Sequence, residues 1–396
     1  MAKILFVYMA GRRSRLLEAR AGREAPMEFL FGLTYLEARG YEVDVLELTD
    51  LSTDRNSAAH ENLLRENVRL QQATGFTSTS HHFDGSLDIL NRYDGIIAGG
   101  DGLGIGISHF IRKGTVKPPM FVVTTGMLLH TQLQVRPSPL KARVRDIARN
   151  LYYRFVFGRN RKRRRVYGDL LDASSGTLYF ERSEYEMAQR MFPEYANRMH
   201  LSIQCIDTNF WRPNLATNRK GSSPDYILFI GNDRGRDFEL VQKIARHLSH
   251  LHFVFVTNRI RSEEVPSNVT LKQGDWKANL ISDVEIRRII QDSSVVVLPF
   301  KSGDLHTLTS VALQAMACGK PVMVSKTSGL WEPEFIDRQH IWFIHSGSLS
   351  EWCEDIEVLM RDSLNRERIG ELARRLVEGQ NNLTVLGSNL EAIIKQ

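Results

Sequence analysis

Short apolar runs alternate with segments of helical periodicity from one end of the chain to the other, and this alternation restricts the fold more than any other feature. Most of the runs are apolar at consecutive positions, as in strands that are buried on both faces of a parallel sheet. Strands alternating with helical segments indicate an α/β fold with crossover helices. The predicted strands cover residues 4–8, 43–46, 96–98, 121–123, 177–180, 201–203, 227–230, 253–256, 269–271, 295–298, 322–324 and 341–344.

A polar stretch in the middle divides these strands into two series. The chain has 396 residues, too many for one ordinary hydrophobic core and suitable for two α/β domains. Residues 214–224 carry almost no apolar surface, as expected of a linker. We predict a first Rossmann-like domain over residues 1–212, a linker over 213–224, a second Rossmann-like domain over 225–375, and a helix over 376–396 that crosses back to the first domain. Capping boxes at Ser282 with Glu285 and at Ser348 with Glu351 predict two helix starts in the second half.

Composition excludes several classes of protein. A hydrophobic fraction of 42% and a charged fraction of 25% are typical of globular proteins. No apolar run approaches the roughly 20 residues that cross a bilayer, and the opening residues 1–8 are too short for the core of a signal peptide. The three cysteines lack the spacing of metal ligands and fit a reducing compartment. We therefore expect a cytoplasmic protein without a metal site.

Positive charge is concentrated in one segment, residues 136–167. The chain has a net charge of +6, and this segment holds twelve lysines and arginines but a single acid, Asp146. Residues 141–157 have the pattern of an amphipathic basic helix, and a basic run, Arg161–Arg165, follows it. Three interpretations remain open: peripheral docking on an anionic membrane surface, binding to a nucleic-acid backbone, or a solvated crossover helix followed by a disordered basic loop. The residues expected to contact the acceptor or the membrane are Arg12, Arg13, Arg161, Lys162, Arg163 and Arg164.

The segment 294–332 has the order of a ligand-binding strand, loop and helix. The apolar strand 295–299 leads into a polar loop over 300–310, a helix follows over 311–317, and the next strand begins at 322. Gly319 is placed to end the helix in the left-handed conformation. In doubly wound sheets, ligands bind at the carboxyl ends of strands, and the amides near residues 307–310 are suited to a diphosphate. An ordinary strand–turn–helix with incidental polar residues remains the alternative.

The same segment resembles the donor-binding region of the "group 1" (family four) glycosyltransferases. The similarity lies in Leu298-Pro299-Phe300, in residues 314–322 and in Gly329-Leu330-Trp331-Glu332. Residues 229–237 are similar to the family's glycine turn, residues 206–213 to its signature before the interdomain linker, and residues 183–185 to its serine–glutamate helix start. The resemblance implies the GT-B fold, in which two Rossmann-like domains face a central cleft. It also implies a retaining transfer from a nucleotide sugar, with a UDP-sugar as the expected donor and no cofactor or metal required.

Carried over position by position, the resemblance assigns roles in donor binding. Arg236 would pair with the donor diphosphate, and Gly231 would let the backbone approach it. Gln314 stands where the family places a glutamate on the ribose, and a neutral amide there can still bond hydroxyl groups. The implied donor-binding residues are Gly231, Asn232, Arg234, Arg236, Lys301, Thr307, Thr309, Ser310 and Gln314.

The candidate catalytic residues are Asp101, His306 and His130. Asp101 lies in the glycine-rich run 99–106 after a buried strand, where it would project from the strand's carboxyl end as a base or an acceptor ligand; a helix cap is the alternative. His306 stands where the family has an acid near the donor sugar. Thr125 occupies a position where many relatives carry a histidine, and His130 lies nearby.

These features predict transfer of a hexose-like unit from a nucleotide sugar to a membrane-associated lipid or glycan acceptor. A glycosyltransferase acting on modified DNA bases is the first alternative, because the basic segment also suits a duplex. A non-catalytic protein that binds sugar nucleotides is the second, because His306 and Gln314 depart from the family pattern. The sequence makes no prediction about oligomeric state.

Overall fold

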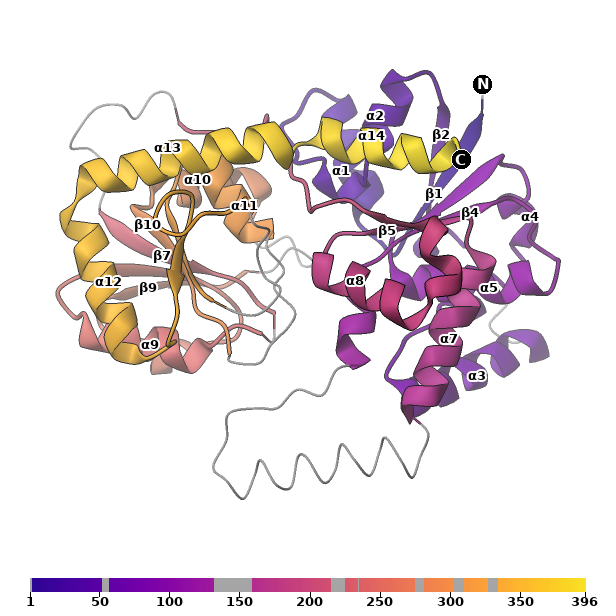
Figure 1. The fold of residues 1–396 in the computed structure, drawn as a ribbon, viewed down its shortest axis with the longest axis horizontal. Coiled ribbons are helices and arrows are strands. Elements are labelled where there is room, and N and C mark those ends of the chain that lie inside the picture. Colours follow the sequence, from indigo (N-terminus) through magenta and orange to yellow (C-terminus); the bar gives the residue numbers. More distant parts are fainter. Residues whose placement is uncertain are drawn as a thin grey trace. The chain divides into compact units, whose positions relative to one another are not determined.

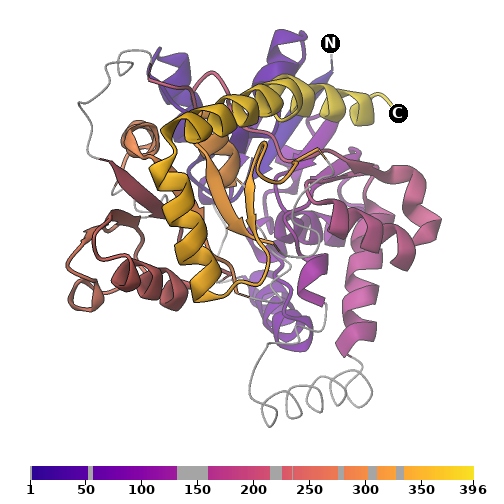
Figure 2. The same ribbon diagram turned by 60° about the vertical axis from the view of Figure 1, so that its left-hand side comes forward.

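A computed structural model describes residues 2–51, 57–131, 159–214, 225–233, 235–274, 281–301, 310–326 and 334–396. The chain forms two compact units, each built around one sheet (Figures 1 and 2). Unit 1 comprises Met1–Ala21, Met27–Ile203 and Thr384–Gln396, and unit 2 comprises Gly22–Pro26 and Gln204–Leu383. The chain therefore passes between the units more than once, and residues 204–212, which the sequence placed with the first domain, lie in unit 2.

Unit 1 contains a parallel six-stranded sheet of order β2-β1-β3-β4-β5-β6. Its strands are β1 (Lys3–Tyr8), β2 (Glu42–Glu47), β3 (Gly95–Ala98), β4 (Met120–Val123), β5 (Gly176–Tyr179) and β6 (Met199–Leu201). Strand order reverses beside β1, since β2 lies on one side of it and β3 and its successors lie on the other. This arrangement is the doubly wound topology that the sequence predicted.

Helices cover both faces of the unit 1 sheet (Figure 1). They are α1 (Arg12–Arg20), α2 (Leu33–Ala38), α3 (Ala58–Thr74), α4 (Leu87–Leu90), α5 (Asp101–Arg112), α7 (Arg159–Ala173), α8 (Arg182–Met191) and, from the end of the chain, α14 (Leu383–Ile394). Core residues of β1, β3 and β4 pack with α5, α7 and α8 on one face. On the other face, Ile393 of α14 lies against Gly176 of β5, where an added Cβ would come within 2.5 Å of it.

Unit 2 contains a second parallel sheet, of order β12-β11-β10-β7-β8-β9. Its strands are β7 (Tyr226–Ile230), β8 (His252–Val256), β9 (Val269–Lys272), β10 (Val295–Leu298), β11 (Val322–Ser325) and β12 (Trp342–Ile344). Its helices are α9 (Phe238–His247), α10 (Asp283–Asp292), α11 (Ser310–Ala317), α12 (Leu349–Arg361) and α13 (Ser363–Gln380). Alternate strand residues enter two separate cores, one with α10, α11 and α13 and one with α9 and α12, which explains why the strands are apolar at consecutive positions.

The structure confirms all twelve predicted strands, with limits that differ by at most two residues. It also confirms both predicted helix starts, because the hydroxyls of Ser282 and Ser348 accept hydrogen bonds from the amides of Glu285 and Glu351. The disordered loop of the third interpretation was wrong for the basic run Arg161–Arg165, which belongs to helix α7. The helix is stabilised by its later residues, since Tyr167, Leu170 and Leu171 are buried in the unit 1 core. The amphipathic helix expected over residues 141–157 lies outside the described residues.

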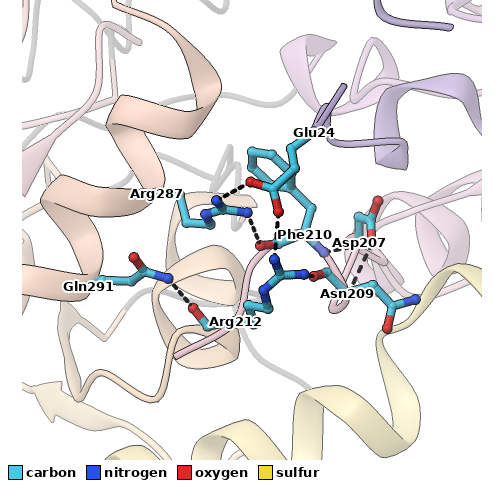
Figure 3. Close-up of polar contacts among 7 residues, drawn as sticks. All are labelled: Glu24, Asp207, Asn209, Phe210, Arg212, Arg287 and Gln291. Carbon is cyan, nitrogen blue, oxygen red and sulfur yellow. Dashed lines mark hydrogen bonds and ion pairs between the residues drawn. The ribbon is translucent and has the colours of Figure 1, made fainter. Parts of the chain in front are cut away.

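A short segment from the start of the chain, Gly22–Pro26, is held in unit 2 by Glu24 (Figure 3). The Glu24 carboxylate accepts hydrogen bonds of 2.5 Å from both Arg212 and Arg287. The largely buried Arg287 guanidinium also donates to the carbonyl oxygen of Phe210 and lies 4.6 Å from the centre of its ring. Asp207 accepts from the amide of Phe210 and so closes the turn that presents this carbonyl. Phe210 and Arg212, which precede the polar stretch 214–224, are thus bound to helix α10 of unit 2.

Candidate donor site

The point where strand order reverses in unit 2 lies between β7 and β10. The chain runs from β7 outward to β8 and β9, and then returns to the other side of β7 to form β10, β11 and β12. In open parallel sheets, ligands bind outside the carboxyl ends of the strands at such a point. Gly231 follows β7 there, and Pro299 and Phe300 follow β10. The predicted donor loops therefore leave the sheet side by side.

Arg236 joins these two loops from a buried position. Only 1% of the residue is exposed, its Nε lies 2.9 Å from Oδ2 of Asp233, and its guanidinium carbon lies 4.5 Å from the ring centre of Phe300. Backbone bonds fasten the loops together: the amide of Asp237 donates to the carbonyl of Pro299, and the amide of Lys301 donates to the carbonyl of Gly235. The guanidinium is therefore held in one orientation at the carboxyl edge of the sheet.

The environment of Arg236 leaves part of its hydrogen-bonding capacity unused. Its Nη1 is buried and has no hydrogen-bond partner among the described residues. Burial lowers the pKa of Arg236, and Asp233 partly opposes this effect. An arginine remains charged in proteins, and a buried donor without a partner costs about 1–3 kcal/mol. An anionic ligand at this edge would supply the missing acceptor.

Gly231 is required by the position of Arg236. Its φ of +147° lies in a region that side chains disfavour, and an added Cβ would stand 2.8 Å from Nε of Arg236. The sequence assigned this glycine to close approach of a ligand, and the structure shows that its nearest neighbour is the arginine. Any side chain at this position would press directly on the guanidinium.

Other predicted donor residues have different surroundings. The side chain of Asn232 donates to the carbonyl of Gly274 and accepts from Thr257 and from the amide of Asn258, so that it connects the ends of β7, β8 and β9. Lys301 is exposed directly after Phe300. Ser310 begins α11, and Gln314 is buried one turn later. Arg234, His306, Thr307 and Thr309 lie outside the described residues.

In unit 1, Asp101 begins α5 at the carboxyl end of β3. Its Oδ2 accepts from both the amide and the hydroxyl of Thr125, at 2.7 and 2.6 Å, and only 1% of the residue is exposed. It is not the N-cap of the helix, because Gly100 occupies that position. In this structure Asp101 holds the loop after β4, and its role as a base stays a prediction. His130 lies in the short helix Leu128–Thr131, and its side chain lies outside the described part.

The arginines that follow β1 separate into two environments. Arg13 forms a two-pronged ion pair with Asp50, whereas Arg12 lies 4.6 Å from the ring centre of Phe29. Burial lowers the pKa of Arg12 to about 10. The amides of both arginines donate to one oxygen of Glu47, at 2.6 and 2.8 Å. A protein carboxylate thus already occupies these two amides at the N-terminus of α1, where an anionic ligand would otherwise bind.

The predicted acceptor cations on α7 lie on the surface of unit 1. Arg161, Lys162 and Arg164 are exposed, whereas Arg163 is partly buried and its Nε donates to the carbonyl of Thr74. They occupy the first half of a helix whose first turn has no acid, although cations there oppose the helix dipole. A cavity of about 560 Å³ lies beside them. Its lining includes Arg161, Arg164, Arg165, Asp169, Asp172 and Glu194.

The described ranges contain no group of three or more His, Cys, Asp or Glu side chains that could hold a metal ion. The described helices also include none that is both apolar and long enough to cross a bilayer. Sequence reasoning missed the contacts of Arg236 with Asp233 and Phe300, although both residues lie in motifs that it had singled out. The i, i+3 spacing of Asp233 and Arg236 was the available signal for the ion pair.

Comparisons with known proteins agree with this arrangement. Residues 224–362 match the family "Glycosyl transferases group 1". No match was found among curated proteins. Among solved structures, sucrose-phosphate synthase from Thermosynechococcus elongatus is similar over 100% of this chain and 99% of its own, with a TM-score of 0.65 and 15% identity.

Two further structures cover the whole of both chains. HepE from Anabaena, solved with UDP and glucose, has a TM-score of 0.60 and 12% identity. An alpha-glucosyltransferase, solved with UDP and a DNA containing an HMU base, has a TM-score of 0.56 and 13% identity. The two doubly wound units therefore have the GT-B fold of these structures, and residues 224–362, in the second unit, match the "Glycosyl transferases group 1" family.

Proposed function

We propose that the protein transfers a hexose, with retention of configuration, from a UDP-sugar to a membrane-associated lipid or glycan acceptor at the cytoplasmic side. The observation that carries the donor assignment is Arg236, a buried arginine at the strand reversal of unit 2 whose Nη1 has no hydrogen-bond partner among the described residues. Solved structures of similar fold contain UDP, in one case with glucose, which supports this nucleotide.

The chemistry requires stabilisation of a leaving diphosphate. When the glycosidic bond breaks, negative charge develops on the diphosphate oxygens, and a fixed cation in a site without water stabilises that charge strongly. Arg236 cannot reorient, because Asp233 and Phe300 hold two sides of its guanidinium. The N-terminus of α11, at Ser310, adds a positive dipole end at the same edge of the sheet. These groups stabilise the leaving diphosphate without a metal ion.

Donor binding is tested by thermal unfolding with a panel of nucleotides and nucleotide sugars. A ligand at one hundred times its Kd stabilises the folded state by about 2.7 kcal/mol, so UDP and UDP-glucose should raise Tm clearly. Uridine is the matched control: it keeps the base and ribose but lacks the diphosphate, and it should give no comparable shift. If no UDP-, GDP-, ADP-, CMP- or TDP-sugar raises Tm, the proposed function is wrong.

The acceptor assignment is supported by the exposed cations of α7. A cation next to an anionic bilayer contributes about 1 kcal/mol of attraction. Replacing Arg161, Lys162 and Arg165 together with serine should therefore weaken sedimentation with phosphatidylglycerol vesicles by at least tenfold, without affecting phosphatidylcholine vesicles.

A control variant with the same loss of charge replaces Arg288, Arg361 and Arg375, which are exposed on unit 2. It should retain binding to the anionic vesicles. Equal loss in both variants would mean that net charge, and not the α7 surface, causes the attraction.

Modified DNA is the second candidate acceptor, favoured by the similar alpha-glucosyltransferase solved with DNA. The same α7 cations would then bind phosphates, and retention on duplex DNA would fall steeply with salt. Retention on DNA without binding to anionic vesicles would select this candidate. Release of free sugar from UDP-glucose would exclude a protein that only binds the nucleotide sugar.

A further inference from the structure

Two buried carboxyl groups in unit 1 bind the turn Thr124–Leu128, which follows β4. They are Asp101, at the start of α5, and Glu184, in the first turn of α8. Because β3, β4 and β5 are neighbours in a parallel sheet, both helices begin beside the carboxyl end of β4. Each carboxyl is only 1% exposed. The turn is thus bound by side chains from both sides.

Hydrogen bonds define the contact. Asp101 accepts from the amide and the hydroxyl of Thr125. Oε1 of Glu184 accepts from the amide of Leu128 at 2.9 Å, and Oε2 lies 3.1 Å from the hydroxyl oxygen of Thr124. Among the described residues, neither carboxyl forms an ion pair with a cation. Two negative charges here would therefore repel each other in a medium of low polarity.

The hydroxyl of Thr124 indicates which carboxyl carries a proton. Its oxygen also lies 3.3 Å from the carbonyl oxygen of Leu178, yet a hydroxyl has one proton to donate. If Glu184 is neutral, its own proton goes to Thr124, Thr124 donates to Leu178, and both contacts are hydrogen bonds. If Glu184 is ionised, one of the two contacts has no proton. The geometry therefore favours a protonated Glu184.

The surrounding titratable groups agree with this assignment. Burial raises the pKa of Glu184 well above its ordinary value, and the charge of Asp101 raises it further. Burial also raises the pKa of Asp101, but its bonds from Thr125 oppose this effect. The groups that face the pair from other elements are Tyr167 of α7 and Tyr179 of β5, whose hydroxyls lie 3.2 Å apart, and Glu181 before α8. Burial raises the pKa of both tyrosines, so they stay neutral.

We propose that Asp101 and Glu184 are positioning residues, which hold the turn Thr124–Leu128 in place through a proton retained on Glu184. That this turn contributes to acceptor binding rests on the proposed function. Loss of the proton from Glu184 weakens the contacts that hold the turn. Glu184 binds its proton more tightly when the turn is held in place (closed) than when the turn has detached (open), so the closed turn is most stable at low pH. This stability is lost as pH rises from the ordinary pKa of a glutamate toward the raised pKa of Glu184.

Amide hydrogen exchange across a pH series tests the proposal without any substrate. After correction for the intrinsic rate, exchange at Thr125 and Leu128 should accelerate with pH in the wild type, by up to about tenfold per pH unit. Glu184→Gln keeps an acceptor for Leu128 and a donor for Thr124 but cannot ionise. Exchange at Leu128, the amide that residue 184 binds, should therefore stay slow over the same pH range in this variant. An infrared band of a protonated carboxyl should be present in the wild type and absent in Glu184→Gln.

Equal pH dependence in the wild type and in Glu184→Gln would overturn the proposal. So would the absence of the protonated band from the wild type. Glu184→Ala should exchange rapidly at every pH; if it does not fold, the comparison with glutamine still decides. The proposed function is judged separately, because UDP binds in unit 2: a failed nucleotide screen with the expected exchange pattern would disprove the function alone.

Discussion

Arg236→Ala is expected to lower kcat/KM for UDP-glucose turnover by about 10²–10³, as removal of one fixed stabilising group does in other enzymes. The reason is the single position of the guanidinium, which lies against Phe300 and Asp233 and has a buried nitrogen with no partner in the described part of the chain. UDP affinity should fall as well, since the diphosphate is already charged before the reaction. Calorimetric titration with UDP and measurement of UDP release check both effects.

Packing must be separated from charge in this experiment, because alanine also leaves a cavity beside Phe300. Arg236→Met keeps most of the volume and should lose UDP binding while retaining Tm. Arg259→Ala is the matched control: this arginine lies in the following loop, is exposed, and donates to the carbonyl of Asn232. It should bind UDP nearly as the wild type does. If Arg236→Met binds UDP with unchanged affinity, the diphosphate does not contact this arginine.

The sheets could be predicted because their strands are local signals. Residues 227–230 and 295–298 are apolar at every position, as in strands covered on both faces of a sheet, and the structure buries all of them. The end of helix α11 was predictable for the same reason, and the φ of +74° at Gly319 confirms the left-handed conformation there. These features depend on neighbouring residues in the sequence and little on distant ones.

The environment of the site residues could not be predicted, because it depends on contacts between distant segments. The stacking of Arg236 on Phe300 requires β7 and β10 to be adjacent, and the sequence does not state strand order. Asp101 was expected to face an acceptor, whereas Thr125, from the loop after the next strand, binds its carboxylate. For the run Arg161–Arg165, local charge left a disordered loop open as an alternative, whereas burial of Tyr167 and Leu170 keeps the segment helical.

A second large effect is expected from one methyl group on α13. Gly370 packs where α13 crosses the end of α11, and an added Cβ would stand 2.1 Å from the carbonyl oxygen of Gly319 and 2.8 Å from its carbonyl carbon. These are backbone atoms at a helix end, so neither helix relieves the overlap by a side-chain rotation. Gly370→Ala should therefore destabilise unit 2 by about 1–3 kcal/mol or more, although alanine is the better helix former. Urea unfolding measures the change.

Gly379, nine residues further along α13, is the matched control. An added Cβ there meets no atom within 4 Å, so Gly379→Ala should stabilise the helix by about 0.5–1 kcal/mol. The same substitution in the same helix thus has opposite signs at two positions, and only the contact with Gly319 distinguishes them. Because α11 begins at the carboxyl edge of the unit 2 sheet, where we propose that the donor binds, Gly370→Ala should also weaken UDP binding, whereas Gly379→Ala should not. Equal stability of the two variants would show that α13 does not pack on α11 as closely as this structure has it.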